Sequence, residues 1–420
     1  MAARAETRKS EDYYVACFTV IPEEFAAFRE MCDERHSRPL GIDPRDPNQY
    51  DFGEIAGHNV VLCCASRPGP DNIAATAADL LRSFEGIKYA LLVGIGGGVP
   101  SRAYDVRLGD IVVATPGYLT SGITHHDQGK QLSDRFKHLN FPVPPPRALQ
   151  GAVGQMQTRE LVGRSKIPNI ISSVVGKLPN FNRPDNRSDC LFQADYEHVG
   201  ERSDCDECDK KRLVQRSARD NLAPRIHYGV IASGSLLVRS AEKRDSLRDL
   251  YNVCCIDMEA AGIMGTLPSL VIRGIGDYAD SHKNDHWQKY AAVAAAAYAK
   301  ELLQYLSSPV AGSRFCSDEK SGESMATTQT RNHTVEDLLE QKARIIRAYN
   351  WRESIIDLSK VLGLKWDLGS RPQLAQALQV NKGPNGSEIQ NNALRCAIMK
   401  ELRVENENIV IPSHLQVLRN

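Results

Sequence analysis

The chain has 420 residues, and its 52 Lys and Arg residues balance 52 Asp and Glu residues, so its formal net charge is zero. This length allows two domains with sizeable cores, and the charge balance argues against a general nucleic-acid or membrane-surface binder. No apolar run is long enough to span a bilayer, and the N-terminus lacks the apolar core of a signal peptide. The 11 cysteines are an odd number and many fall in apolar stretches, so we expect a cytoplasmic, reducing setting.

Short apolar strands alternate with helical patterns as far as residue 306. Strands are expected at 14–20, 59–65, 89–93, 110–114, 227–232, 253–256 and 270–273. Helices are expected from Pro22 onward, at 72–84 and at about 287–306. This alternation predicts an α/β domain with a mixed central sheet flanked by helices.

The alternating pattern fades between about residues 116 and 225, where a polar, proline-containing stretch predicts a long insertion. The α/β domain is expected to end near residue 308, and the Ser-, Gly- and charge-rich residues 309–333 are typical of a flexible linker. Helical patterns at 335–349, 353–362, 372–378 and 389–402 then predict a small all-α domain over 334–420. Part of this tail resembles a small LysM-like domain family of unknown function, and we expect it to bind a protein.

Three motifs contain residues suited to chemistry. The first is the glycine-rich stretch 94–98, which follows a strand and includes Gly96 and Gly97. It is typical either of a ligand-binding turn or of a close approach between backbones, and Val99 excludes a G-x-G-x-x-G motif. The second is Asp257-Met258-Glu259 at a strand-to-helix junction, where acids also stabilise helix starts. The third is 273–277, Arg-Gly-Ile-Gly-Asp, which predicts either a bend that aims an acid into a cleft or a simple loop.

In their order and spacing, these motifs resemble the purine nucleoside phosphorylase/nucleosidase superfamily, and most of all the nucleoside phosphorylase-like domains of fungal NLR-type multidomain proteins. The resemblance also rests on residues 108–113 and 232–234 and covers about 13–306. It implies the nucleoside phosphorylase/hydrolase fold and an enzyme that breaks a purine N-glycosidic bond without a cofactor.

The resemblance also implies roles for particular residues. Asp277 would protonate or hydrogen-bond the purine N7 atom, while Glu259 and Met258 would hold the ribose. The other residues implied to bind substrate are Arg273, Asp257, Ser233, Val238, Gly96 and Gly97. His126 follows a strand and could reach the 5′ end of the ribose, although a loop histidine is more often polar surface.

The nucleophile is either water or phosphate. The positions at which phosphorylases of this family place an Arg and a Ser correspond here to Leu92 and Ile95, which cannot hold a phosphate. Residues 21–25 resemble the nucleosidase pattern, in which a glutamate orients water, and this role would fall on Glu24. We therefore expect hydrolysis of adenosine, or of a related adenine nucleoside or nucleotide, to adenine and ribose. A phosphorylase and a nucleoside-binding sensor that signals through the helical tail are the alternatives.

The insertion offers two further features. A basic stretch, Lys210, Lys211, Arg212, Arg216 and Arg219, could bind a 5′-phosphate or form a solvated face. Cys205-x-x-Cys208, with Cys190 and His198, has the spacing of a structural zinc site, although one C-x-x-C pair alone is weak evidence. No catalytic metal is expected. The family resemblance further implies a homo-oligomer, most simply a dimer.

Overall fold

The computed structural model describes residues 8–116, 120–131, 136–138, 143–202 and 204–307. In the C-terminal part it describes residues 335, 338–339, 355–364, 371–380, 387–405 and 408–410. The chain divides into two compact units, Met1–Asp318 and Glu319–Asn420. The predicted linker and most of the helix expected at 335–349 lie outside the described residues.

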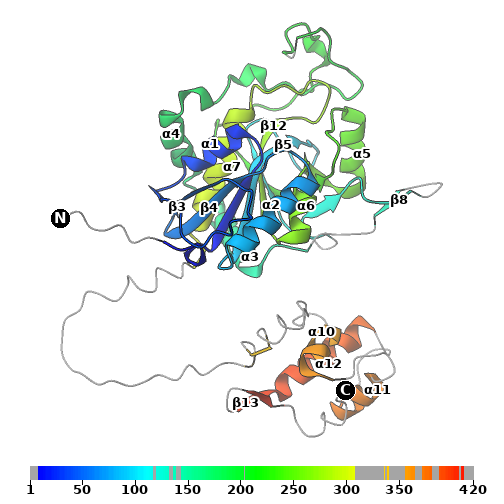
Figure 1. The fold of residues 1–420 in the computed structure, drawn as a ribbon. Helices are drawn as coiled ribbons and strands as arrows, with labels where there is room; N and C mark the ends of the chain where they lie inside the picture. The colour runs from blue at the N-terminus through cyan, green and yellow to red at the C-terminus, as the bar shows by residue number, and fades with distance from the viewer. Residues whose placement is uncertain are drawn as a thin grey trace, which may run out of the picture. The chain divides into compact units, whose positions relative to one another are not determined.

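A mixed sheet of ten strands forms the centre of the first unit (Figure 1). Its strands are β1 Val15–Thr19, β2 Glu34–Arg35, β3 Tyr50–Ile55, β4 His58–Cys64, β5 Tyr89–Gly98, β6 Ile111–Ala114, β7 Ile123–His125, β10 Ile226–Ser233, β11 Val253–Asp257 and β12 Leu270–Asp277. Along the sheet the order is β11-β10-β6-β12-β5-β1-β4-β3-β2, with β7 paired to β10. A separate hairpin joins β8 Gly129–Gln131 to β9 Phe136–His138.

The sheet closes on itself at one end. Strand β5 pairs in parallel with β1 and β12, and its last residues, Gly97 and Gly98, pair antiparallel with Ile256 and Cys255 of β11. Strands β5, β12, β6, β10 and β11 therefore form a continuous ring of pairings. This ring brings the carboxyl ends of β5, β11 and β12 together, although the strands are far apart in sequence.

Helices surround the sheet (Figure 1). They are α1 Pro22–Arg29, α2 Pro70–Ser83, α3 Arg147–Leu161, α4 Ile167–Lys177, α5 Ala241–Tyr251, α6 Ala260–Thr266 and α7 Gln288–Leu303. The alanine-rich α7 packs on β5 and β12, and α1, α3 and α4 contact its other sides. Most of α7 is buried as a result, and the helices α3 and α4 of the predicted insertion become part of the main core.

The structure confirms the α/β class and the mixed sheet, and it corrects two local expectations. The glycine-rich stretch 94–98 is not a turn, because β5 runs through Gly98. Likewise β12 continues past Arg273 to Asp277 instead of bending at its two glycines. Residues without side chains let these strands continue where buried charged groups pack against them.

The second unit contains the helices α10 Ile355–Leu362, α11 Arg371–Ala377 and α12 Glu388–Glu401. A separate core, which includes Leu358 and Leu394, holds them together. The unit also has a short hairpin between β13 Arg403–Glu405 and β14 Asn408–Val410, which the sequence pattern did not predict. Among the described helices of both units, none combines the length and apolar character needed to cross a bilayer.

Candidate active site

A cavity of about 420 Å³ lies at the carboxyl ends of β5, β11 and β12, beside the start of α1. Small-molecule sites of α/β proteins commonly form at this end of a sheet. Eight residues that the sequence pointed to line this cavity: Glu24, Gly96, Gly97, Val238, Asp257, Met258, Glu259 and Asp277. They come from distant parts of the chain, so the closure of the sheet assembles them.

Arg273 lies beneath the cavity and is fully buried. Its Nε and Nη2 atoms donate to Asp257 Oδ2 at 2.9 and 2.6 Å, and Nη2 also donates to Glu259 Oε2 at 3.0 Å. Burial opposes the charge of Arg273, but the neighbouring carboxylates outweigh that effect and raise its pKa. Arg273 is not on the cavity wall, so it is placed to orient the two acids and not to touch a ligand.

Glu24 joins the first helix to the glycine-rich end of β5. As the third residue of α1 it reaches back to the N-terminus, where its Oε2 atom accepts hydrogen bonds from the Val20 and Ile21 amides at 2.7 and 3.2 Å. Its Oε1 atom accepts a hydrogen bond from the Ile95 amide at 2.8 Å. Burial raises the pKa of Glu24, although Arg273 and the three amides oppose this shift.

Gly94 allows Glu24 and Arg273 to approach each other. A Cβ atom at position 94 would overlap Glu24 Oε1 and would lie 2.5 Å from Arg273 Nη1. That Nη1 atom is buried and has no hydrogen-bond partner among the described residues. The glycine therefore makes room for the buried side chains of both Glu24 and Arg273, which any larger residue would displace.

Asp277 ends β12 and lines the cavity together with residues of α1. Its Oδ1 atom accepts a hydrogen bond from the Ala279 amide at 2.8 Å, and its Oδ2 atom forms an ion pair with Lys283. A Cβ atom at Gly97 would lie 3.1 Å from Asp277 Oδ1 and 2.8 Å from Ala279 Cβ. The missing side chain of Gly97 thus leaves the space in which the carboxyl group of Asp277 lies.

Comparison with known proteins identifies the fold. The sequence profile of the Phosphorylase superfamily matches residues 14–308, more than half of the chain. The chain belongs to the phosphorylase superfamily. The profile of a domain of unknown function (DUF3597) matches residues 279–409, a range that includes the second unit's described helices.

Three relatives are similar to this superfamily member. A nucleotide-binding leucine-rich repeat (NLR)-like protein of Hyaloscypha variabilis is 37% identical over 309 residues, which are 73% of this chain and 30% of the relative. This chain therefore spans less than a third of that relative's length. A 5′-methylthioadenosine/S-adenosylhomocysteine nucleosidase of Mycobacterium bovis is 23% identical over 298 residues, 70% of this chain and 96% of the relative. The ATP nucleosidase Cap17 of Escherichia coli is 38% identical over 86 residues, 19% of this chain and 17% of the relative. Nucleosidases, which are hydrolases, are thus among the relatives.

Besides Arg273, two residues expected in the substrate pocket of this superfamily member, Ser233 and His126, do not line the cavity. Ser233 is fully buried, and its hydroxyl oxygen accepts a hydrogen bond from the Ala261 amide at 2.9 Å, which supports the start of α6. His126 is buried beside Gly234, and its amide donates to the Ser233 carbonyl at 3.1 Å. Burial also lowers the pKa of His126. The backbone hydrogen bond between His126 and Ser233 joins the end of β7 to the end of β10. Both residues therefore stabilise this part of the fold without lining the cavity.

Sequence reasoning missed Lys283 as a site residue. Lys283 lies on the cavity wall. Among the described residues that line this cavity, no other is a lysine or an arginine. The wall also contains three further acids or amides that the sequence did not single out: Glu23, Asp285 and Gln288. The spacing of Lys283 from Asp277 could have suggested a contact, but only the fold of the intervening loop shows it.

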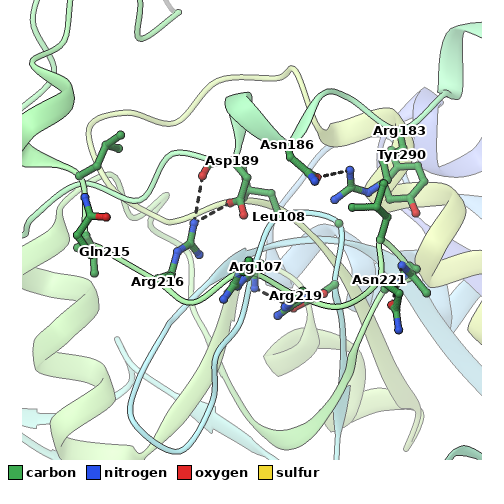
Figure 2. Close-up of a pocket in the computed structure, with 18 residues that line it drawn as sticks. Arg107, Leu108, Arg183, Asn186, Asp189, Gln215, Arg216, Arg219, Asn221 and Tyr290 are labelled. Atoms are coloured by element: carbon green, nitrogen blue, oxygen red, sulfur yellow. Dashed lines mark hydrogen bonds and ion pairs between the residues drawn. The ribbon is translucent and has the colours of Figure 1, made fainter.

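The basic residues of the insertion lie elsewhere. Arg216 and Arg219 line a second cavity of about 390 Å³, shown in Figure 2, which shares no lining residue with the first. Arg216 pairs with Asp189 at 3.2 Å, and Arg219 pairs with Asp110 at 2.6 Å. Lys210, Lys211 and Arg212 are also absent from the wall of the first cavity. Of the two alternatives for this basic stretch, the one in which it binds the 5′-phosphate of a substrate held in the first cavity is therefore wrong.

Proposed function

We propose that this protein is a purine nucleosidase that hydrolyses the N-glycosidic bond of adenosine, or of a closely related adenine nucleoside, to adenine and ribose. The observation that carries the proposal is the hydrogen bond from the Ile95 amide to Glu24. Through this bond a buried carboxylate occupies the Ile95 amide, at a position that the resemblance assigns to phosphate binding in phosphorylases, and this supports water as the nucleophile. A carboxylate repels phosphate but can accept a proton from water.

The acid in this reaction is Asp277. Asp277 is a carboxylate in its ion pair with Lys283, so its proton comes from the Lys283 ammonium group. The bond between C1′ of the ribose and N9 of the purine breaks as Asp277 passes this proton to N7, and the lysine then takes another proton from solvent. The negative charge that would build up on the departing purine is thereby neutralised.

Glu259 and Met258 contact the sugar in this reaction, and Glu24 activates the water. Glu259 and Met258 lie on the wall next to Asp257, where they can contact the ribose hydroxyls and the sugar face. A water molecule attacks C1′ from the side of Glu24, which takes one of its protons. Arg273 holds Asp257 and Glu259 in place through hydrogen bonds from its Nη2 atom.

The charge of the wall favours a nucleoside over a nucleotide. Acidic residues dominate it, namely Glu23, Glu24, Asp257, Glu259, Asp277 and Asp285, and Lys283 is already paired. A triphosphate would meet strong repulsion in this cavity. We therefore place adenosine before AMP and ATP, although a relative is named an ATP nucleosidase.

The exposed leucines at the cavity support the proposal of a homodimer. Leu236 and Leu237 line the cavity, yet they are 68% and 54% exposed. Large apolar side chains at the mouth of a site are suited to cover by another protein surface. Light scattering of the purified chain, compared with Leu236→Ser, tests whether a second copy supplies that cover.

The test of the function is a time course of base release by chromatography. The purified protein is incubated with adenosine, inosine, guanosine, 5′-methylthioadenosine, AMP and ATP, each with and without phosphate. Adenine and free ribose formed equally without phosphate would support the proposal. Release that requires phosphate, with ribose 1-phosphate as product, would identify a phosphorylase. Tight adenosine binding without release would favour the nucleoside sensor.

A further inference from the structure

One segment of the insertion packs on the loop that follows Asp277. The His198 amide donates to Ser281 Oγ at 3.0 Å, and the rings of Phe192 and His282 stack with their centroids 4.1 Å apart. Arg216 Nη1 donates to the Tyr278 hydroxyl at 2.7 Å. The segment therefore contacts residues on the loop between Asp277 and Lys283.

The same segment brings together three residues that bind metals. Ligand atoms of His198, Cys205 and Cys208 all lie within 4.8 Å of one another. Zinc binds thiolate sulfur at about 2.3 Å and imidazole nitrogen at about 2.0 Å in tetrahedral geometry, so ligand atoms around one ion are about 3.5–4 Å apart. Small side-chain movements would place all three around one ion.

The local hydrogen bonds suit a metal ligand set. His198 Nε2 lies 2.9 Å from the Asp204 carbonyl oxygen, which can only accept, so Nε2 carries the proton and Nδ1 keeps its lone pair. A backbone carbonyl that fixes the second ring nitrogen is common for histidines that bind zinc. The Cys208 amide donates to the Cys205 carbonyl at 3.2 Å, which forms the tight turn that brings the two thiols to the same side.

Cys190 is the candidate for a fourth ligand, and its thiol now donates a hydrogen bond to the Arg187 carbonyl at 3.2 Å. It is not part of the three-residue cluster, but it lines the same cavity as Cys205, of about 630 Å³. The lining of that cavity includes four acidic residues, Asp185, Asp204, Asp206 and Asp285, and two basic residues, Arg187 and Lys210, so its charge is acidic on balance. With three sulfurs and one nitrogen, the four side chains form a donor set typical of closed structural zinc sites.

We propose that His198, Cys205, Cys208 and Cys190 bind one structural zinc ion, which holds the insertion against the loop from Asp277 to Lys283. The ion has no place for substrate, because protein side chains fill all four positions. The inference does not depend on the proposed hydrolysis, since it concerns the stability of the insertion.

The first test is the metal content of the full-length protein, purified without a histidine tag, by inductively coupled plasma mass spectrometry. We expect about one zinc ion per chain, and loss of most of it in Cys205→Ser and Cys208→Ser. Cys396→Ser, at an exposed cysteine of the second unit, is the matched control and should keep the metal. A metal-free wild-type protein, or Cys205→Ser with unchanged zinc content, would overturn the proposal.

Two further measurements keep the test decisive if a cysteine variant fails to fold. Replacement of zinc by Co²⁺ in the wild-type protein should give the strong thiolate-to-metal absorption of a tetrahedral, cysteine-rich site. Removal of the metal with a chelator should also speed trypsin cleavage after Lys210, Lys211 or Arg212 by about tenfold or more, because the metal contributes to folding of the segment. Absence of the thiolate band would overturn the site, and unchanged metal affinity in Cys190→Ser would overturn the fourth ligand.

Discussion

Lys283 forms an ion pair with Asp277, and both side chains lie on the wall of one cavity. The second oxygen of Asp277 accepts a hydrogen bond from the Ala279 amide, so both carboxylate oxygens have donors before any ligand arrives. A purine that approaches Asp277 must therefore share this carboxylate with Lys283. Lys283 therefore acts together with Asp277 in the proposed protonation of the purine, and it is not simply a neighbouring surface charge.

Removal of either partner should slow base release to different extents. We expect Asp277→Asn to lower kcat by about 10²–10⁴-fold, because the proton for N7 is lost. Lys283→Met should lower kcat by roughly ten- to a hundredfold and change its pH profile, because Asp277 then takes its proton from water. Lys289→Met, at an exposed residue of α7, is the control and should leave the rate unchanged. Wild-type kinetics in Lys283→Met would remove the lysine from the mechanism.

In the proposed reaction, Glu24 decides whether water is the nucleophile. Glu24→Gln should reduce hydrolysis by about 10²-fold or more, because the amide cannot accept a proton from water. Added phosphate should not restore the rate, since Leu92 and Ile95 leave it without a positively charged partner. Glu85→Gln, at an exposed site, controls for loss of one negative charge. Full activity in Glu24→Gln would contradict the proposed role.

The buried ion pair between Arg273 and Asp257 should matter for folding. Both side chains are fully buried, with 2.6 Å between Nη2 and Oδ2. Asp257→Asn leaves Arg273 with fewer compensating charges, and we expect it to lower the free energy of unfolding by roughly 3–5 kcal/mol. Urea denaturation followed by circular dichroism measures the change. Asp249→Asn removes a more exposed pair with Arg248 and should cost about 0–1 kcal/mol.

Glu259 should make stability depend on pH near neutrality. Burial raises its pKa from the ordinary 4.5 to about 7, and this effect outweighs the attraction of Arg273. The folded chain then holds a proton that the unfolded chain releases at lower pH. The stabilisation is complete below the unfolded pKa of 4.5 and is lost as pH rises through the folded value of about 7.

Comparison of the wild type with Glu259→Gln isolates this effect, because glutamine does not titrate. Between about pH 4.5 and pH 8 the wild type should lose up to about 3 kcal/mol of unfolding free energy relative to the variant. Urea denaturation at several pH values measures the difference. A difference that stays constant over this range would show that the pKa of Glu259 is the same in the folded and unfolded chain.

The sequence was most informative at the ends of strands. The motifs at 257–259 and 273–277 follow apolar runs that could be recognised as buried strands, but the expectation that their acids share one site came from the family resemblance. Asp257, Glu259 and Asp277 all line the same cavity. The strand β3 Tyr50–Ile55 was missed because polar residues and a glycine interrupt its apolar pattern. The pairing of β5 with β11 was also missed, since it depends on strands far apart in the chain and has no local signal. The resemblance implied that Ser233 contacts substrate and left open whether His126 reaches the ribose or lies on polar surface, whereas the fold buries both residues away from the cavity lining.

The cavity wall links ligand binding to the folding stability of the first unit, because its residues come from early and late parts of that unit's sequence. Glu24 follows the first strand of the unit, whereas Asp277 ends the last strand of its sheet. A ligand that touches both residues binds only the folded unit, and it stabilises that unit by about 2.7 kcal/mol at a concentration one hundred times its Kd. Under the proposed function, the supply of nucleoside in the cell would therefore set the fraction of the protein that is unfolded and open to proteolysis, as well as the rate of hydrolysis.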